Sequence, residues 1–312
     1  MLFSRPDRFS RRRSYNFRAM PELPEVETVR RSLEPCLMGR TIQAVELLRP
    51  DVVTGSATPA ALLVGQTVTA LQRHGKQLAM VGSQRGKNGS PARCICVHLG
   101  MTGSLRYFQG RTPPGRHNHV VWQLQGGGRV LFADPRRFGG LWTFASRAAL
   151  LERRWAVLGP DALTVSPTLL HARLMGTRRP LKSALLDQSV VAGLGNIYVD
   201  ELLHACGLHP CTPAGTLTFA QVGPLVRRMR RLLGRAIEAG GSTVRDYVDG
   251  TGRQGGFQLR HQVYGRAGEQ CRGCGAVLEQ LIVGGRTTVF CSGCQRSAKT
   301  QASRVRVRKL LL

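Results

Sequence analysis

The pattern of apolar and polar residues changes once along the chain, from a strand-like part to a helix-like part. Residues 24–34 are predicted to form a leading helix, because Val26, Val29 and Leu33 recur three or four positions apart and form one apolar stripe. From about 41 to 145 the apolar runs are short, β-branched and partly alternating, which is typical of strands.

The clearest strand candidates are residues 41–48, 93–100, 119–125 and 129–134. Gly126–Gly128 separates the last two and predicts a hairpin turn. Many short antiparallel strands in succession favour a sandwich or a barrel.

From about residue 147 the pattern is helical, with segments 147–159 and 195–207 each closed by a glycine. Thr218 and Gln221 form a capping-box pattern for a long helix that ends near Ala239. Gly223–Pro224 disfavours a helix interior, so this helix is expected to start late or to kink there.

Three further segments lack any apolar period. Residues 240–262 are polar and Gly-rich, which predicts a mobile loop. Residues 1–20 are Arg-rich and are left out of the fold, as a translation-start artefact or an Arg-rich transit peptide. The basic tail, 297–312, has no assigned role and is expected to be disordered.

Charge is the strongest feature of the composition. Lys and Arg number 45 against 18 Asp and Glu, a net charge of +27. A chain this basic is expected to bind a polyanion, with nucleic acid first, although composition alone does not exclude a ribosomal or merely basic protein. No stretch approaches the ~20 apolar residues of a membrane span, so no membrane partner is expected.

Four of the nine cysteines form two C-x-x-C pairs separated by 16 residues: Cys271, Cys274, Cys291 and Cys294. Two such pairs can complete a tetrahedral site for one structural Zn²⁺ with no open position for catalysis. A reduced, metal-free cluster is the alternative. The segments between the pairs, 279–285 and 287–291, predict a β-hairpin. The odd cysteine count and the lack of an apolar leader favour a reducing cytoplasm.

Four motifs accompany the cysteine module in order along the chain. They are PELPEVETVRR from Pro21, HLGMTGSLR at 98–106, DPRRFGG at 134–140 and GLGNIYVDELL at 193–203. Together they resemble formamidopyrimidine-DNA glycosylase, a bacterial family that acts on oxidised purines, over nearly the whole chain from Pro21 to about Arg296. Leu23 in PELPE favours this branch over the sister family, endonuclease VIII, which usually opens with a PEGPE-like run.

The resemblance implies an α+β fold in which an N-terminal antiparallel β-sandwich with a leading helix is followed by a helical domain with a helix–two-turn–helix and a zinc β-hairpin. The expected division is 1–20 extension, 21–150 catalytic sandwich, 151–262 helical domain with a lesion-covering loop, 263–296 zinc hairpin and 297–312 basic tail. The implied partner is damaged double-stranded DNA, bound by a monomer without an organic cofactor.

The chemistry implied by the resemblance is base excision through a Schiff base, followed by strand cleavage by β,δ-elimination. Pro21 is the implied nucleophile. Its amine suits this role, because an α-amino group has a pKa near ~7.7–8.0, whereas a lysine, near ~10.4, stays protonated. Glu22 is the implied acid–base residue, although an isolated Glu there would be read as a helix-start carboxylate. Lys76 is implied in β-elimination and Arg286 in δ-elimination and phosphate binding.

DNA contacts are likewise carried over from the resemblance. A base in a duplex is reached only by flipping its nucleotide out, and apolar wedges commonly fill the gap. The implied gap-filling residues are Met101, Arg136 and Phe138, and the implied phosphate contacts are His98, His117, Arg178 and Asn196. Gly195–Asn196 opens a helix, so its backbone N–H groups are also expected to cradle a phosphate.

Two rival functions remain at this point. One is an endonuclease VIII-like enzyme for oxidised pyrimidines, and the other is a non-catalytic zinc-hairpin DNA-binding protein. The second gains weight if residues 1–20 stay attached, because a peptide bond to Met20 removes the amine of Pro21. The active protein is therefore expected to begin at Pro21.

Overall fold

The computed structural model describes residues 20–83, 92–110 and 115–296. The expectations for the first nineteen residues of the extension and for the tail, 297–312, lie outside the described residues. Within the described part, every helix is too short or too polar to cross a membrane.

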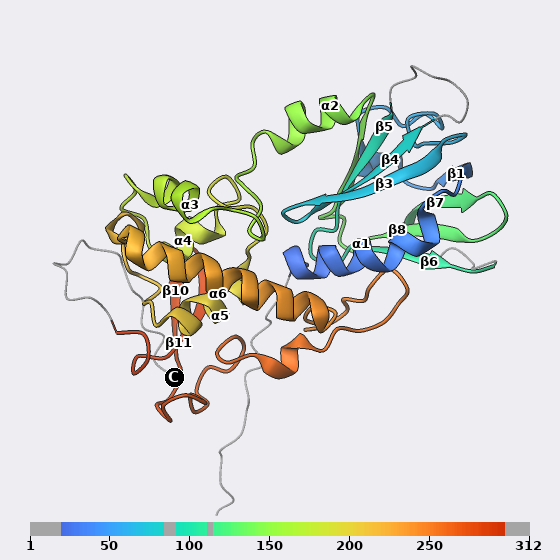
Figure 1. Cartoon of the computed structure of the whole chain (residues 1–312). Coiled ribbons are helices and arrows are strands. Elements are labelled where there is room, and N and C mark those ends of the chain that lie inside the picture. Colours follow the sequence, from blue (N-terminus) through green and yellow to red (C-terminus); the bar gives the residue numbers. More distant parts are fainter. Residues whose placement is uncertain (1–19, 84–91, 111–114, 297–312) are drawn as a thin grey trace, which may run out of the picture.

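Two β-sheets form the N-terminal part of the molecule (Figure 1). One has the strand order β2–β9–β5–β4–β3 and the other β1–β7–β8–β6. The strands are β1 (Ile42–Leu47), β2 (Val53–Thr54), β3 (Thr67–His74), β4 (Gln77–Ser83), β5 (Arg93–His98), β6 (Ser104–Phe108), β7 (Asn118–Leu124), β8 (Arg129–Ala133) and β9 (Gly140–Phe144). All pairings are antiparallel except that of β2 with β9. The expected sandwich and the hairpin turn at Gly126–Gly128 are confirmed.

Helix α1 (Leu23–Leu37) begins one residue before and ends three residues after the predicted range. Its start is extended because the carboxylate of Glu25 accepts a hydrogen bond from the backbone N–H of Glu22 at 2.9 Å. Its end is extended because Leu37, fully buried, continues the apolar stripe. Most of α1 packs in the core between the sheets, but Leu23 packs in the core of the helical part. One helix therefore contributes to both cores.

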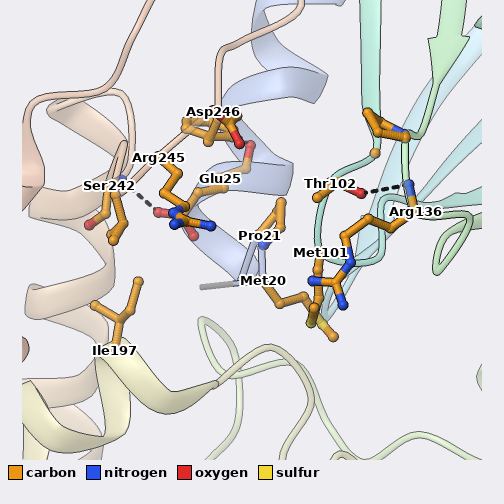
Figure 2. A pocket seen from close by; sticks show the side chains of 14 residues that line it. Met20, Pro21, Glu25, Met101, Thr102, Arg136, Ile197, Ser242, Arg245 and Asp246 are labelled. Atoms are coloured by element: carbon orange, nitrogen blue, oxygen red, sulfur yellow. Dashed lines mark hydrogen bonds between the residues drawn. The ribbon is translucent and has the colours of Figure 1, made fainter. Parts of the chain in front are cut away.

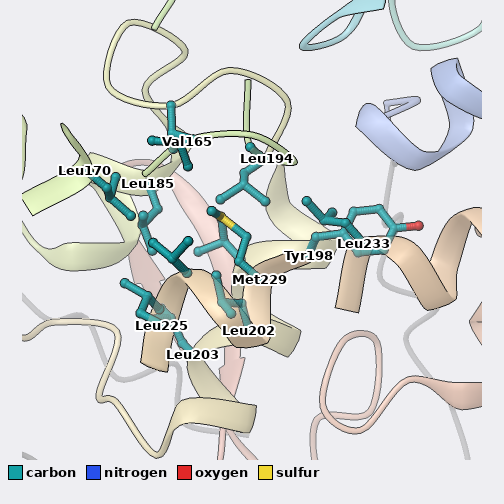
Figure 3. Packing of buried hydrophobic residues seen from close by; sticks show 14 of the residues in the cluster. Val165, Leu170, Leu185, Leu194, Tyr198, Leu202, Leu203, Leu225, Met229 and Leu233 are labelled. Atoms are coloured by element: carbon teal, nitrogen blue, oxygen red, sulfur yellow. The ribbon is translucent and has the colours of Figure 1, made fainter. Parts of the chain in front are cut away.

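The helical part is built around a second apolar core, to which α5 and α6 contribute most (Figure 3). Its helices are α3 (Pro167–Leu174), α4 (Leu181–Leu186), α5 (Asn196–Cys206) and α6 (Phe219–Glu238). Helix α2 (Arg147–Leu150) and the adjoining π-helical turn η2 (Leu151–Trp155) instead pack on the five-stranded sheet, because Leu150 and Trp155 share an apolar cluster with residues of β4 and β5. The helix expected to reach Gly159 stops at Trp155, where a turn from Trp155 to Leu158 takes its place. The closure of α5 by Gly207, in the left-handed conformation at φ 65°, is confirmed.

Helix α6 starts at Phe219 behind the predicted Thr218–Gln221 capping box. The expected late start is wrong, because the helix runs through Gly223 and Pro224. Pro224 is the sixth residue of the helix, so its ring removes only the bond to the carbonyl of Ala220, an exposed residue that water can solvate.

The segment 240–262, expected to be a mobile loop, is instead tied to the rest of the molecule. The backbone N–H of Ser242 donates to Glu25 at 2.7 Å, and that of Gly250 donates to Ser32 at 2.8 Å. The backbone N–H of Tyr107 donates to the carbonyl of Gly250 at 2.7 Å. A short 3₁₀ helix, η4 (Phe257–Arg260), closes the segment.

A buried ionic network joins the two parts of the chain. The Arg73 guanidinium, at the end of β3, donates to Glu27 of α1 and to Asp161 of the helical part. Asp161 also accepts from the backbone N–H of Gly75 at 2.8 Å. Because Arg73 and Asp161 are both nearly buried and fully paired, this network fixes the orientation of one part against the other.

The C-terminal hairpin consists of β10 (Glu279–Val283) and β11 (Arg286–Phe290), as predicted. A buried ion pair connects the hairpin to α4 and α5. Lys182 of α4 donates to Asp200 of α5 at 2.6 Å and to the carbonyl of Thr287 in β11 at 3.1 Å. Asp200 also accepts from the backbone N–H of Val289 at 3.1 Å.

We expect Lys182→Met to lower the free energy of unfolding by ~3–5 kcal/mol, because Asp200 is then a buried carboxylate without its counter-charge. Chemical denaturation measures this loss. The double variant Lys182→Met/Asp200→Leu, which removes both charges, should recover part of it. Single and double variants of equal stability would contradict this account.

Candidate active site

Two adjoining cavities lie where the N-termini of α1 and α5 meet the loops of the N-terminal sheets. Their volumes are about 340 Å³ and about 370 Å³. Met20 and Met101 line both. The first cavity, drawn in Figure 2, places Pro21 opposite Arg136 and next to the segment 242–247.

The second cavity is lined by residues that are far apart in the sequence. The predicted site residues among them are Glu22, Lys76, His98, Met101, Asn196 and Arg286. They come from α1, the turn after β3, β5 and the loop after it, α5 and β11. The structure thus brings all four predicted catalytic residues to one pair of cavities.

Glu22 lies buried against the N-terminus of α5. Its carboxylate accepts from the backbone N–H groups of Gly195 at 2.6 Å and Ile197 at 2.8 Å. Burial raises the pKa of Glu22 to about 7, although the nearby Lys76 and these backbone donors act in the opposite direction. Near neutral pH this side chain therefore exists in both protonation states, as an acid–base group requires.

The same contacts correct one expectation. The backbone N–H groups at the start of α5 were expected to cradle a phosphate, but those of Gly195 and Ile197 are bonded to Glu22. The side chain of Asn196 donates to the carbonyl of Thr287 at 2.9 Å, which holds β11 beside the cavity.

Lys76 follows Gly75 in the turn between β3 and β4. Gly75 has φ +55°, and a Cβ atom there would lie 2.9 Å from the Cβ of Ala192, so the turn needs a glycine. Burial lowers the pKa of Lys76, while Glu22 opposes this shift. The lowered pKa increases the fraction of neutral amine, the form that accepts a proton.

His98 is a neutral donor at this site. Burial, with Arg154 and Lys76, lowers its pKa to about 4. Its Nδ1 accepts from the backbone N–H of Gly100 at 3.2 Å, which leaves the proton on Nε2. A neutral imidazole with one N–H can donate a hydrogen bond to an anion without adding charge.

Arg136 and Phe138 form a stacked pair on the loop between β8 and β9. The Arg136 guanidinium lies 4.4 Å from the centre of the Phe138 ring, and Phe138 as a residue is 54% exposed. Asp134 shapes this loop, because its carboxylate accepts from the backbone N–H groups of Arg136 and Gly139. An exposed aromatic ring on such a fixed loop suits insertion into a partner molecule.

Three predicted residues lie outside both cavities. Phe138 and His117 are exposed on the N-terminal part, and Arg178 is exposed on the loop before α4. The backbone of His117 accepts from the N–H of Asp134 at 3.1 Å, which places it beside the Arg136–Phe138 loop. Arg178 forms no hydrogen bond or ion pair with any residue of 20–83, 92–110 or 115–296 that lines the cavities.

A buried polar cluster behind Pro21 was not predicted from the sequence. Glu25 accepts hydrogen bonds from the hydroxyl of Tyr198 and from the backbone N–H of Ser242. Burial raises the pKa of Glu25. The only sequence signal was an acidic residue in the first turn of a helix, which ordinarily faces solvent.

The four predicted cysteines converge at the base of the hairpin. Their Sγ atoms all lie within 4.8 Å of one another, with 3.9 Å between Cys271 and Cys294 and 3.3 Å between Cys274 and Cys291. A tetrahedral Zn–S₄ site with bonds of ~2.3 Å would separate its sulfurs by about 3.8 Å. His204 Nε2 lies 3.5 Å from the sulfur of Cys271. The cluster therefore fits a four-thiolate metal site.

Comparison with known proteins agrees with this geometry. Residues 20–141 match the domain family described as "Formamidopyrimidine-DNA glycosylase N-terminal domain". Residues 158–248 match the family described as "Formamidopyrimidine-DNA glycosylase H2TH domain". A formamidopyrimidine-DNA glycosylase of Moorella thermoacetica is 44% identical over 266 residues, which are 84% of this chain and 94% of the relative. One from Laribacter hongkongensis is 44% identical over 89% of this chain and its own full length.

Solved structures give the same result. A Lactococcus lactis FPG variant in complex with a Fapy-dG containing DNA superposes with a TM-score of 0.80 at 34% identity, covering 89% of this chain and 100% of that one. The MutM (FPG) protein from Thermus thermophilus superposes with a TM-score of 0.76 at 37% identity, with the same coverage. The chain therefore belongs to the formamidopyrimidine-DNA glycosylase family of enzymes.

Proposed function

We propose that this protein is a bifunctional DNA glycosylase/AP lyase that removes oxidised purines, such as 8-oxoguanine and formamidopyrimidines, from double-stranded DNA. The observation that carries the proposal is the meeting of Pro21, Glu22 and Lys76 at two adjoining cavities. The Lactococcus relatives crystallised with Fapy-dG containing DNA and with abasic site containing DNA support both halves of the activity.

In the proposed reaction, the free amine of Pro21 attacks C1′ of the flipped nucleotide as the bond from C1′ to the base breaks. Glu22, in its protonated form, donates a proton to the sugar ring oxygen or to the departing base. The ring bond between C1′ and O4′ then breaks as O4′ takes up a proton, Pro21 loses its N–H proton, and an iminium links Pro21 to C1′. Loss of a C2′ proton to Lys76 then expels the 3′ phosphate in β-elimination, and δ-elimination beside Arg286 expels the 5′ phosphate.

The remaining proposed residues hold the DNA. Met101, Arg136 and Phe138 fill the gap left by the flipped nucleotide, with the exposed Phe138 ring as the wedge. The proposed phosphate contacts are His98, His117, Arg178 and Asn196. The four-cysteine cluster binds one structural Zn²⁺, which holds the hairpin and so positions Arg286 at the second cavity.

Excision assays on 8-oxoguanine and thymine glycol duplexes test the substrate class. We expect faster excision of 8-oxoguanine, and the reverse order would favour the endonuclease VIII-like alternative. Borohydride trapping of the protein on lesion DNA tests the covalent step, and an absence of adduct with active protein would favour a non-catalytic DNA-binding protein.

The rate of excision should follow a bell-shaped pH profile. The rising limb reflects loss of the proton from Pro21, and the falling limb reflects loss of the proton from Glu22 as the pH passes about 7. Glu22→Gln should slow single-turnover excision by ~10²–10⁴-fold and remove the falling limb. A falling limb that persists in Glu22→Gln would assign it to another group.

Lys76→Ala should impair catalysis more than binding. We expect strand cleavage to slow by ~10²-fold or more, with little change in the Kd for a duplex carrying an abasic-site analogue. Arg49→Ala, which removes an exposed positive charge outside both cavities, is the matched control. Equal losses in rate and affinity would remove Lys76 from the catalytic group.

A further inference from the structure

The outer face of α6 carries three arginines that neither the fold nor the proposed reaction uses. The inner face packs its apolar residues on α1, α3 and α5, and these are Val222, Leu225, Val226, Met229, Leu233, Ala236 and Ile237. At 3.6 residues per turn, Arg227, Arg231 and Arg235 fall on the opposite side of the helix. All three are exposed, and we call them the outer arginine face.

Repulsion among these three arginines destabilises the helix when nothing is bound to it. Like charges four residues apart on a helix repel each other, and none of the three forms an ion pair with a carboxylate of residues 20–83, 92–110 or 115–296. Arg230, by contrast, lies off this face and donates to the carbonyls of Thr164 and Val165. A bound polyanion would relieve the repulsion on the outer face.

The spacing of the outer arginine face fits a nucleic-acid backbone. Positions four residues apart on a helix are separated by ~6 Å along its axis. Each strand of duplex DNA carries one phosphate per ~3.4 Å of duplex axis, and because the strand winds around that axis, neighbouring phosphates lie farther apart than this rise, at a spacing comparable to that of the arginines.

The position of this face separates it from the proposed lesion site. None of its arginines lines either cavity. They point away from α1 and α5, the helices whose N-termini lie at those cavities. We propose that the outer arginine face binds a second segment of duplex DNA while the cavities hold the lesion, an inference that rests on the proposed function for the identity of the polyanion.

A bridging experiment tests this proposal. The full chain is loaded with a short fluorescent duplex that carries an abasic-site analogue, and an undamaged biotinylated duplex is then used to capture the complex on beads. We expect the wild-type protein to be captured with its fluorescent duplex. R227Q/R231Q/R235Q should reduce capture at least tenfold. Its salt dependence should also be weaker, with a log–log slope less steep by about 3.

The matched control is R49Q/R147Q/R153Q, which removes three exposed arginines elsewhere and should leave capture unchanged. Absence of capture by the wild-type protein, or equal capture by both triple variants, would overturn the inference. Polyglutamate that competes as well as DNA of equal charge would overturn the assignment to DNA. Excision of 8-oxoguanine from a separate duplex is measured in parallel, so that failed capture with intact excision leaves the proposed function standing.

Discussion

Protein that begins at Pro21 should form a borohydride-stable adduct with lesion DNA, and protein that retains residues 1–20 should form none. The reason is chemical, because a peptide bond to Met20 turns the amine of Pro21 into an amide without a usable lone pair. The structure adds a steric reason, since Met20 lines both cavities and would stand where the sugar must approach. The adduct is measured on denaturing gels and mapped by mass spectrometry.

The affinity of the protein that retains residues 1–20 for a duplex with an abasic-site analogue serves as the control for DNA binding. Retained affinity with a lost adduct would show that the defect is in the covalent step. An adduct on protein whose intact leader is confirmed by mass spectrometry would mean that the nucleophile is not Pro21. In that case Lys76, the buried amine at the second cavity, becomes the next candidate.

Cys271→Ser should abolish zinc binding and DNA binding while leaving the N-terminal sheets folded. The apolar cluster of the cysteine module is small, consisting of Val263, Cys271, Leu278, Val289 and Cys291, so the module needs its metal to fold. Loss of the hairpin removes Arg286 from the second cavity and the backbone partner of Asn196. Metal analysis and DNA titration measure the two losses.

Tryptophan fluorescence gives the folding control for this variant. The three tryptophans of the chain are Trp122, Trp142 and Trp155, and all lie outside the cysteine module. Trp122 is fully buried between the sheets, so its emission reports that core. Cys36→Ser, a substitution in α1, is the matched cysteine control. Active Cys271→Ser protein without zinc would contradict a structural role for the metal.

The features that the sequence predicted correctly are those set by neighbours along the chain. The Gly126–Gly128 turn, the Gly207 closure of α5 and the convergence of the cysteine pairs each depend on a few consecutive residues. The family resemblance also located part of the lining of the two cavities, although the roles of these residues remain predictions: Pro21, Glu22, Lys76, His98, Met101, Arg136, Asn196 and Arg286.

The features that escaped prediction depend on residues far apart in the chain. Glu22 bonds to the backbone of Gly195, 173 positions away, and Arg73 bonds to Asp161, 88 positions away. Periodicity cannot show such contacts, since each residue alone has an ordinary local explanation. The tethering of 240–262 was missed for the same reason, because its partner Glu25 is an acidic residue in an otherwise unremarkable first turn.

The dual membership of α1 has a consequence for dividing the protein into fragments. Leu23 completes the core of the helical part, whereas Val26, Val29 and Leu33 complete the core between the sheets. A cut in the connection between β9 and α3 would therefore separate the helical fragment from Leu23 and from the Glu22 carboxylate that caps α5. Neither fragment should reach its native packing alone, and the two should recover it only by complementation. In evolution, too, neither part could be exchanged by recombination without the other, because both cores depend on residues of the first helix.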